Sequence, residues 1–179
     1  MIRLLLILLF VVFHARLALA DSNIKAFDLQ TMPQRERDFI GILRQAQDKF
    51  GGARTTESRR NVRLEMQMHL ADFAKLSPSA LDWIGVVHRT HTDRAGFASI
   101  SIEIWPDINF STATSRLADP QNQTLITAGT KLYETVSRLE TGRVVKFGAV
   151  LIGGRLASDE EMVRHPVVMV RFTSLTPED

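Results

Sequence analysis

The sequence predicts an α+β protein: an N-terminal helical hairpin, then a five-stranded antiparallel barrel with one helix between its third and fourth strands. Apolar residues recur at three- and four-residue intervals up to about residue 75, which is the spacing of amphipathic helices. From residue 82 onward β-branched residues replace the helix formers, and apolar and polar residues alternate. The chain of 179 residues contains no cysteine, so its stability must come from a packed core and not from disulfides.

The first twenty residues have the three parts of a secretory signal peptide. Arg3 supplies the positive start, residues 4–13 form an unbroken apolar core, and an Ala-x-Ala cleavage site ends at Ala20. His14 interrupts the apolar run before it reaches the ~20 residues that a membrane span needs. We therefore expect residues 1–20 to be removed. The mature chain should be periplasmic or secreted, with no stable membrane insertion after cleavage.

Charge is balanced in the mature chain. The formal net charge of +2 comes from Arg3 and Arg16 of the leader, and the remainder has equal numbers of basic and acidic residues. Nucleic-acid binding relies on a basic surface that releases counterions from phosphates, so this composition argues against it. A protein or an envelope polymer is the expected partner, and nothing in the sequence indicates a cofactor.

Residues 21–80 are expected to hold the helical hairpin. Within residues 33–50, Phe39, Leu43 and Phe50 share one helical face, and we expect Thr31 with Gln34 to cap the start. A second helix should begin after Thr55 or Thr56 and end near residue 75, because Ser77-Pro78 disfavours further helix. The short link between the two helices predicts an antiparallel pair.

Residues 81–179 are expected to form the barrel. Residues 83–91 read as the first strand and residues 93–96 as a turn. The clearest strand follows, since Ala98, Ile100, Ile102 and Ile104 alternate with polar residues, as in a half-buried strand. The remaining elements are a weak strand at 108–114, a helix at 130–139, a strand at 143–153 with a bend at Gly148, and a strand at 167–175.

The order strand, strand, strand, helix, strand, strand is that of the OB-fold, a five-stranded Greek-key barrel. An open antiparallel sheet with one helix would give nearly the same pattern. Particular segments also resemble the succession found in exported bacterial OB-fold-like proteins of uncharacterised function. These segments are residues 82–87, 99–102, 124–126, 131–133, 142–148 and 166–173. The resemblance covers about residues 82–175 and rests on strand patterns and turn glycines, so it implies a fold and export but no catalytic residue.

The outward positions of the clear strand are the candidate ligand-binding residues. They are Phe97, Ser99, Ser101, Glu103 and Trp105, with Arg89 nearby on the first strand. In OB barrels the second and third strands form the usual ligand face, where aromatic rings stack on bases or sugars. The alternative is that the rings of Phe97 and Trp105 pack under the helical hairpin.

No assembled catalytic or metal site is evident. His88 and His91 are three residues apart on a strand, so without a bulge they point to opposite faces and form no metal pair. His165 is isolated in sequence and reads as a surface or hydrogen-bonded histidine. We therefore expect a non-enzymatic binding or interaction module. The alternative is a hydrolase of envelope polymers with Glu103 or Asp107 as its acid, and a third possibility is a structural protein that binds a partner.

Overall fold

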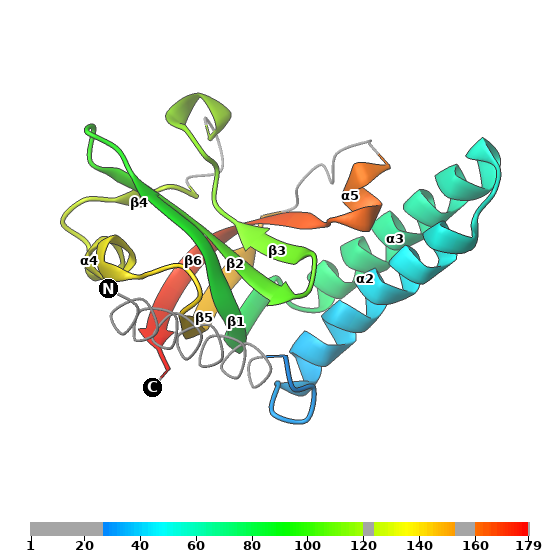
Figure 1. Ribbon diagram of the computed structural model, residues 1–179, viewed down its shortest axis with the longest axis horizontal. Helices are drawn as coiled ribbons and strands as arrows, with labels where there is room; N and C mark the ends of the chain where they lie inside the picture. Colours follow the sequence, from blue (N-terminus) through cyan, green and yellow to red (C-terminus); the bar gives the residue numbers. More distant parts are fainter. Residues whose placement is uncertain (1–26, 120–123, 153–159, 179) are drawn as a thin grey trace, which may run out of the picture.

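The computed structural model describes residues 27–119, 124–152 and 160–178. The predicted signal peptide, residues 1–20, lies outside the described residues. An antiparallel hairpin of two helices, α2 (Gln34–Gly52) and α3 (Thr56–Leu76), adjoins one end of a β-barrel, and a shorter helix, α4 (Lys131–Arg138), lies at the other end (Figure 1). Neither these nor any other helix in the described ranges is long and apolar enough to cross a membrane.

The two long helices begin differently. Thr55 and Ser58 form a reciprocal capping box at α3, in which each hydroxyl accepts the other residue's backbone N–H. The predicted Thr31–Gln34 cap of α2 is wrong. Pro33 occupies the N-cap position without a side-chain hydrogen bond, and the Thr31 hydroxyl donates instead to the carbonyl of Asp28. Proline already has a φ that suits the first turn, so α2 can start without that bond.

Five strands close the barrel. They are β1 (Ser79–Thr92), β2 (Phe97–Trp105), β3 (Ile108–Ser111), β5 (Val144–Leu151) and β6 (Val167–Pro177). They pair in the order β1-β5-β6-β3-β2, and β1 also pairs with β2, which completes the circle. β4 (Ile126–Thr127) adds two residues to the edge of β2.

The barrel is mixed and not wholly antiparallel as predicted. β3 and β6 are parallel, with Phe110 opposite Val168, whereas the other pairs are antiparallel. After β3 the chain forms α4, the barrel strand β5 and the short helix α5 (Glu161–Arg164) before β6 begins. β6 then lies beside β3 and runs in the same direction. The predicted irregularity at Gly148 is confirmed, since the register with β6 shifts between Gly148 and Ala149.

The interior half of the alternation predicted for β2 is confirmed, but Ser101 on the other face is buried as well, at 8% exposure. Ala98, Ile100, Ile102 and Ile104 are fully buried inside the barrel. β1 passes close above this row at Gly85, where a Cβ atom would lie 2.5 Å from Ile102 Cγ2 and 2.7 Å from the Glu103 carbonyl oxygen. A side chain larger than hydrogen at position 85 would force β1 and β2 apart.

Helix α2 closes the hairpin end of the barrel. Its Phe39 ring packs edge-on against Phe110 of β3 and Phe73 of α3, and it also contacts Trp83 of β1. Further aromatic contacts continue from Phe110 to Phe147 of β5. One apolar cluster therefore extends from α3 through α2 into the barrel.

A buried carboxyl group anchors α2 to β1. Glu36 is fully buried, and both of its carboxyl oxygens accept the backbone N–H of Ile84 at 3.1 Å. Ile84 is opposite Lys146 of β5, but β1 pairs with β2 only from Val86 onward, so the side chain from α2 satisfies an N–H that β2 does not reach. Burial raises the pKa of Glu36 to about 8 against a smaller opposing effect of the Ile84 hydrogen bond, so the group is mostly protonated at neutral pH.

Candidate ligand-binding face

The candidate site is the outside of the barrel over β1, β2 and β3, here called the outer face. Because the even-numbered residues of β2 fill the interior, its odd-numbered residues point outward. Strand register then places residues of β1 and β3 beside them. The outer face consists of Arg89, His91, Phe97, Ser99, Ser101, Glu103, Asn109 and Ser111.

A continuous cross-strand row runs through the middle of the outer face. Ser101 of β2 lies between Arg89 of β1 and Ser111 of β3, and Ser111 is opposite Met169 of β6. Side chains directly opposite on neighbouring strands lie within contact range. The predicted neighbourhood of Arg89 and Ser101 is therefore present, and it extends across four strands.

Two shorter rows flank the central one. Glu103 is opposite Asn109, and His91 is opposite Ser99. The Ser101 hydroxyl reaches the Asn109 side-chain oxygen across the rows at 3.5 Å. The outer face thus offers hydroxyl, amide, guanidinium and carboxylate groups at fixed strand spacing.

Phe97 ends the outer face near the β1–β2 turn. The guanidinium of Arg116 lies 4.8 Å from the centre of its ring and comes from a 3₁₀ turn, Arg116–Ala118, beyond β3. Such a contact fixes the ring while leaving it partly open to solvent. Phe97 therefore does not pack under the helical hairpin.

Trp105, by contrast, packs against the hairpin side of the molecule. The register of β2 with β3 shifts between Glu103 and Trp105, which interrupts the alternation at this end. The indole lies 4.9 Å from the guanidinium of Arg44 in α2 and 6.1 Å, edge-on, from the ring of Phe27. The two aromatic residues therefore have different neighbours, and Trp105 lies at the margin of the outer face.

Asp107, in the turn between β2 and β3, contacts Glu103 of β2 and His165, which follows α5. The backbone N–H of Asp107 donates to Glu103 Oε1 at 3.1 Å, and Asp107 has a φ of 68°, a left-handed conformation. His165 Nδ1 lies 3.2 Å from Asp107 Oδ1, and its Nε2 lies 3.4 Å from Glu161 Oε1. The sequence did not predict these partners, since residues 58 positions apart meet only through the barrel.

The geometry of this cluster does not enclose a reacting group. The side chains of His165 and Asp107 are 52% and 64% exposed. An acid catalyst normally lies in a site shielded from solvent, and that environment brings its pKa close to the pH at which the reaction takes place. The cluster instead ties the β2–β3 turn to the segment that precedes β6.

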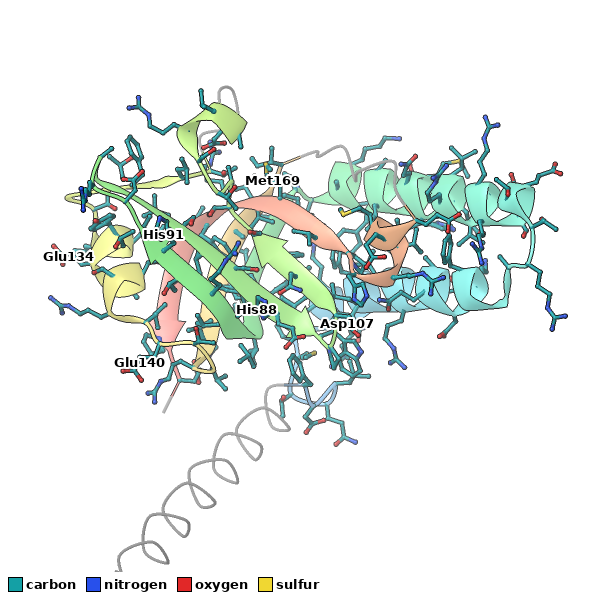
Figure 2. All side chains as sticks on the ribbon, turned by 45° about the horizontal axis from the view of Figure 1, so that its top comes forward. His88, His91, Asp107, Glu134, Glu140 and Met169 are labelled. Carbon is teal, nitrogen blue, oxygen red and sulfur yellow. The ribbon has the colours of Figure 1, made fainter. Side chains whose placement is uncertain are left out.

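The regular alternation of side chains between the two faces of β1, which was assumed for His88 and His91, is interrupted. Register shifts between Val87 and Arg89, so His88 is an extra residue in β1 and the argument from opposite faces does not hold there. Both imidazoles are exposed, and Figure 2 shows them at separate points along the strand. Within residues 27–119, 124–152 and 160–178, no three His, Asp or Glu side chains gather into a possible metal site.

Comparison with known proteins gives no indication of a ligand for the outer face. No family model matches the chain, and neither a curated protein nor a solved structure matches it significantly. The barrel and the side chains on its surface are therefore the basis for a proposed function.

Proposed function

We propose that this chain is an exported binding module, without enzymatic activity, whose barrel is of the OB type. The support for the OB type is the pairing order, in which the third and last long strands are parallel and the first strand pairs with both the second and the fourth. The position of α4 between the third and fourth barrel strands adds to it. Export is supported by the signal-peptide pattern of residues 1–20.

The proposed ligand surface is the outer face, with Arg89, Phe97, Ser99 and Glu103 as its main contacts around the buried Ser101. The observation that carries this proposal is the row from Arg89 through Ser101 to Ser111, which continues across neighbouring strands in one register. A rigid sheet holds these donors and acceptors at fixed spacing, so the side chains would lose little conformational entropy when a ligand binds. Trp105 would border a bound ligand.

The chemistry of the outer face suits a glycan-containing envelope polymer. Hydroxyl and amide side chains exchange hydrogen bonds with sugar hydroxyls, and Phe97 offers a ring for stacking. Arg89 could pair with a carboxylate, which peptidoglycan carries on its peptide stems. The balanced charge of the mature chain argues against nucleic acid as the ligand.

Binding of purified peptidoglycan fragments, measured by calorimetry, tests the proposal. We expect Arg89→Ala to weaken binding about tenfold, the loss of one charged hydrogen bond. Arg60→Ala is the control, because Arg60 is also an exposed arginine but lies on α3, in the hairpin that projects away from the barrel. Equal affinity of both variants and the wild type would refute the outer face as the site.

One observation favours the hydrolase alternative, namely the contact of Asp107 with His165. Turnover of the same fragments separates the two functions. If the chain is a binding module, no more product should form than in a blank without the protein. Turnover that disappears in Glu103→Gln or in Asp107→Asn would establish the enzyme instead.

Export has its own test. Mass spectrometry of the protein recovered from the periplasm or the medium should give a chain that starts at Asp21. A full-length chain held in the cytoplasm would refute export without bearing on the outer face.

A further inference from the structure

Helix α3 has a long face that no other part of residues 27–119, 124–152 and 160–178 covers. Of its 21 residues only Met66 and Phe73 are buried, and both point toward the side that packs on α2. The opposite side is exposed along the whole helix. Figure 1 shows that the α2–α3 hairpin projects away from the barrel, so this side is accessible.

The exposed side of α3 has the spacing of a coiled-coil seam. Six exposed residues follow one another at intervals of four, three, four, three and four positions, which keeps them on one line of the helix. These six residues, here called the α3 seam, are Glu57, Asn61, Leu64, Met68, Ala71 and Lys75. Apolar residues occupy its middle, and Leu64 and Met68 are 47% and 61% exposed.

The α3 seam is complementary to itself when a second copy lies antiparallel. A twofold axis near the centre of α3 places Leu64 of one copy opposite Met68 of the other, and Asn61 opposite Ala71. At both ends Glu57 of one copy then faces Lys75 of the other. A parallel arrangement would instead place Glu57 against Glu57 and Lys75 against Lys75, which repel.

We propose that two copies of this chain associate through the α3 seam, antiparallel, to form a weak twofold dimer. This inference is independent of the outer face and of its ligand. The two hairpins would form a four-helix layer in which each α3 keeps its contacts with its own α2. The barrels, with their outer faces, would lie at opposite ends of that layer.

Lys75 already has a partner within its own chain, and that contact leaves the proposal intact. Its Nζ lies 2.9 Å from Asp72 Oδ1, with the two side chains 74% and 70% exposed. An exposed pair of this kind contributes little to stability. Glu57 of the second copy can therefore approach Lys75 from the seam and join the pair.

Cysteine cross-linking tests the antiparallel arrangement, since the natural chain has no cysteine. Asn61→Cys and Ala71→Cys keep the apolar centre and both end charges. In an antiparallel dimer, a mixture of the two variants should form the mixed disulfide on mild oxidation. Each variant alone should not, because its two identical positions would lie roughly 15 Å apart along the helix. Cross-linking of each variant alone but not of the mixture would overturn the antiparallel dimer.

Charge exchange tests the end pairs, with sedimentation velocity over a range of protein concentrations as the measurement. We expect a wild-type dissociation constant on the order of 100 µM, given the small apolar centre. Glu57→Lys and Lys75→Glu should each weaken association several-fold, and the double variant should restore it. Failure of the double variant to restore association would overturn the pairing of Glu57 with Lys75.

A substitution in the apolar centre tests the seam itself. Leu64→Glu should abolish dimer formation without unfolding the exposed helix, which far-ultraviolet circular dichroism checks. Leu117→Glu is the control, because Leu117 is 95% exposed in the 3₁₀ turn Arg116–Ala118 and does not belong to the hairpin. A wild-type chain that stays monomeric at millimolar concentration, or a Leu64→Glu variant that dimerises as the wild type does, would refute the proposal.

Discussion

Helices α2 and α3 are of similar length and lie side by side, yet different interactions hold them. α2 buries six residues in the core and starts without a side-chain cap, whereas α3 buries two and starts with a capping box. Short helices are marginal in water unless packing or local capping stabilises them. The comparison indicates that α2 is held by tertiary packing as part of the barrel core, and that α3 depends more on local interactions.

Both helices have an exposed side, but the exposed residues of α2 are polar or glycine, whereas those of α3 include Leu64 and Met68. α2 lies between the barrel and α3, with Phe39 in contact with Phe110 on one side and Phe73 on the other. α3 is joined to it at few points, such as Arg35, whose guanidinium donates to the Phe73 carbonyl oxygen at 3.1 Å. The exposed side of α3, which carries apolar residues, therefore suits a second copy better than that of α2.

The largest expected effect concerns Glu36, the buried carboxyl of α2. Its pKa is about 8 in the folded chain and 4.5 as a free group, so the unfolded chain releases this proton at lower pH than the folded chain does. The contribution of Glu36 to stability should therefore be fully present below about pH 4.5, fall as the pH rises, and be lost above about pH 8. The full loss amounts to about 5 kcal/mol.

Urea unfolding of Glu36→Gln at pH 5, 7 and 9 checks this prediction. Gln keeps an oxygen for the Ile84 N–H but cannot ionise, so its advantage over the wild type should grow with pH. Glu140→Gln is the control, because Glu140 is an exposed glutamate after α4, labelled in Figure 2. A constant difference between Glu36→Gln and the wild type across this range would contradict the buried, raised pKa.

Loss of the Phe39 ring should have the next largest effect. Phe39→Ala would leave a cavity where α2, α3 and the barrel meet, at a cost of about 3–5 kcal/mol. If that variant does not fold, Phe39→Leu keeps most of the volume and should cost less than about 1.5 kcal/mol. A cost below about 1 kcal/mol for Phe39→Ala, measured by urea unfolding, would mean that α2 is not part of the core.

Removal of the α3 cap should have the smallest effect of the three. Thr55→Ala deletes the hydroxyl that accepts the Ser58 N–H, which should cost about 1 kcal/mol. Thr31→Ala is the matched control, since Thr31 caps neither helix. Equal losses for the two variants in urea unfolding would show that α3 does not depend on its cap.

Local sequence patterns predicted most of the elements but not how distant ones meet. The β2 interior, the Thr55 cap and the irregularity at Gly148 each follow from a few neighbouring residues, and the structure contains all three. The parallel pairing of β3 with β6 joins segments far apart in the chain, so no local pattern could show it. β1 also begins at Ser79 and not at residue 83, because pairing with β5 extends it.

The candidate site was predicted in part for the same reason. Arg89 was expected near the β2 row because the first two strands are adjacent, and it does lie opposite Ser101, but the burial of Ser101 was not predicted. The shift in register near Trp105 and the contact between Asp107 and His165 arise from tertiary packing. The burial of Glu36 could have been predicted, since it lies one helical turn before Phe39 and Ile40 on the apolar face of the predicted helix.

Native-state hydrogen exchange tests most directly the claim that α2 belongs to the barrel core and α3 does not. The amides of α2 around Phe39 and Leu43 should exchange only with the free energy of global unfolding, as those of β2 do. The amides in the middle of α3, around Leu64 and Met68, should exchange at a lower free energy in the dilute protein. Exchange of both helices together, at a free energy below that of the strands, would contradict the account.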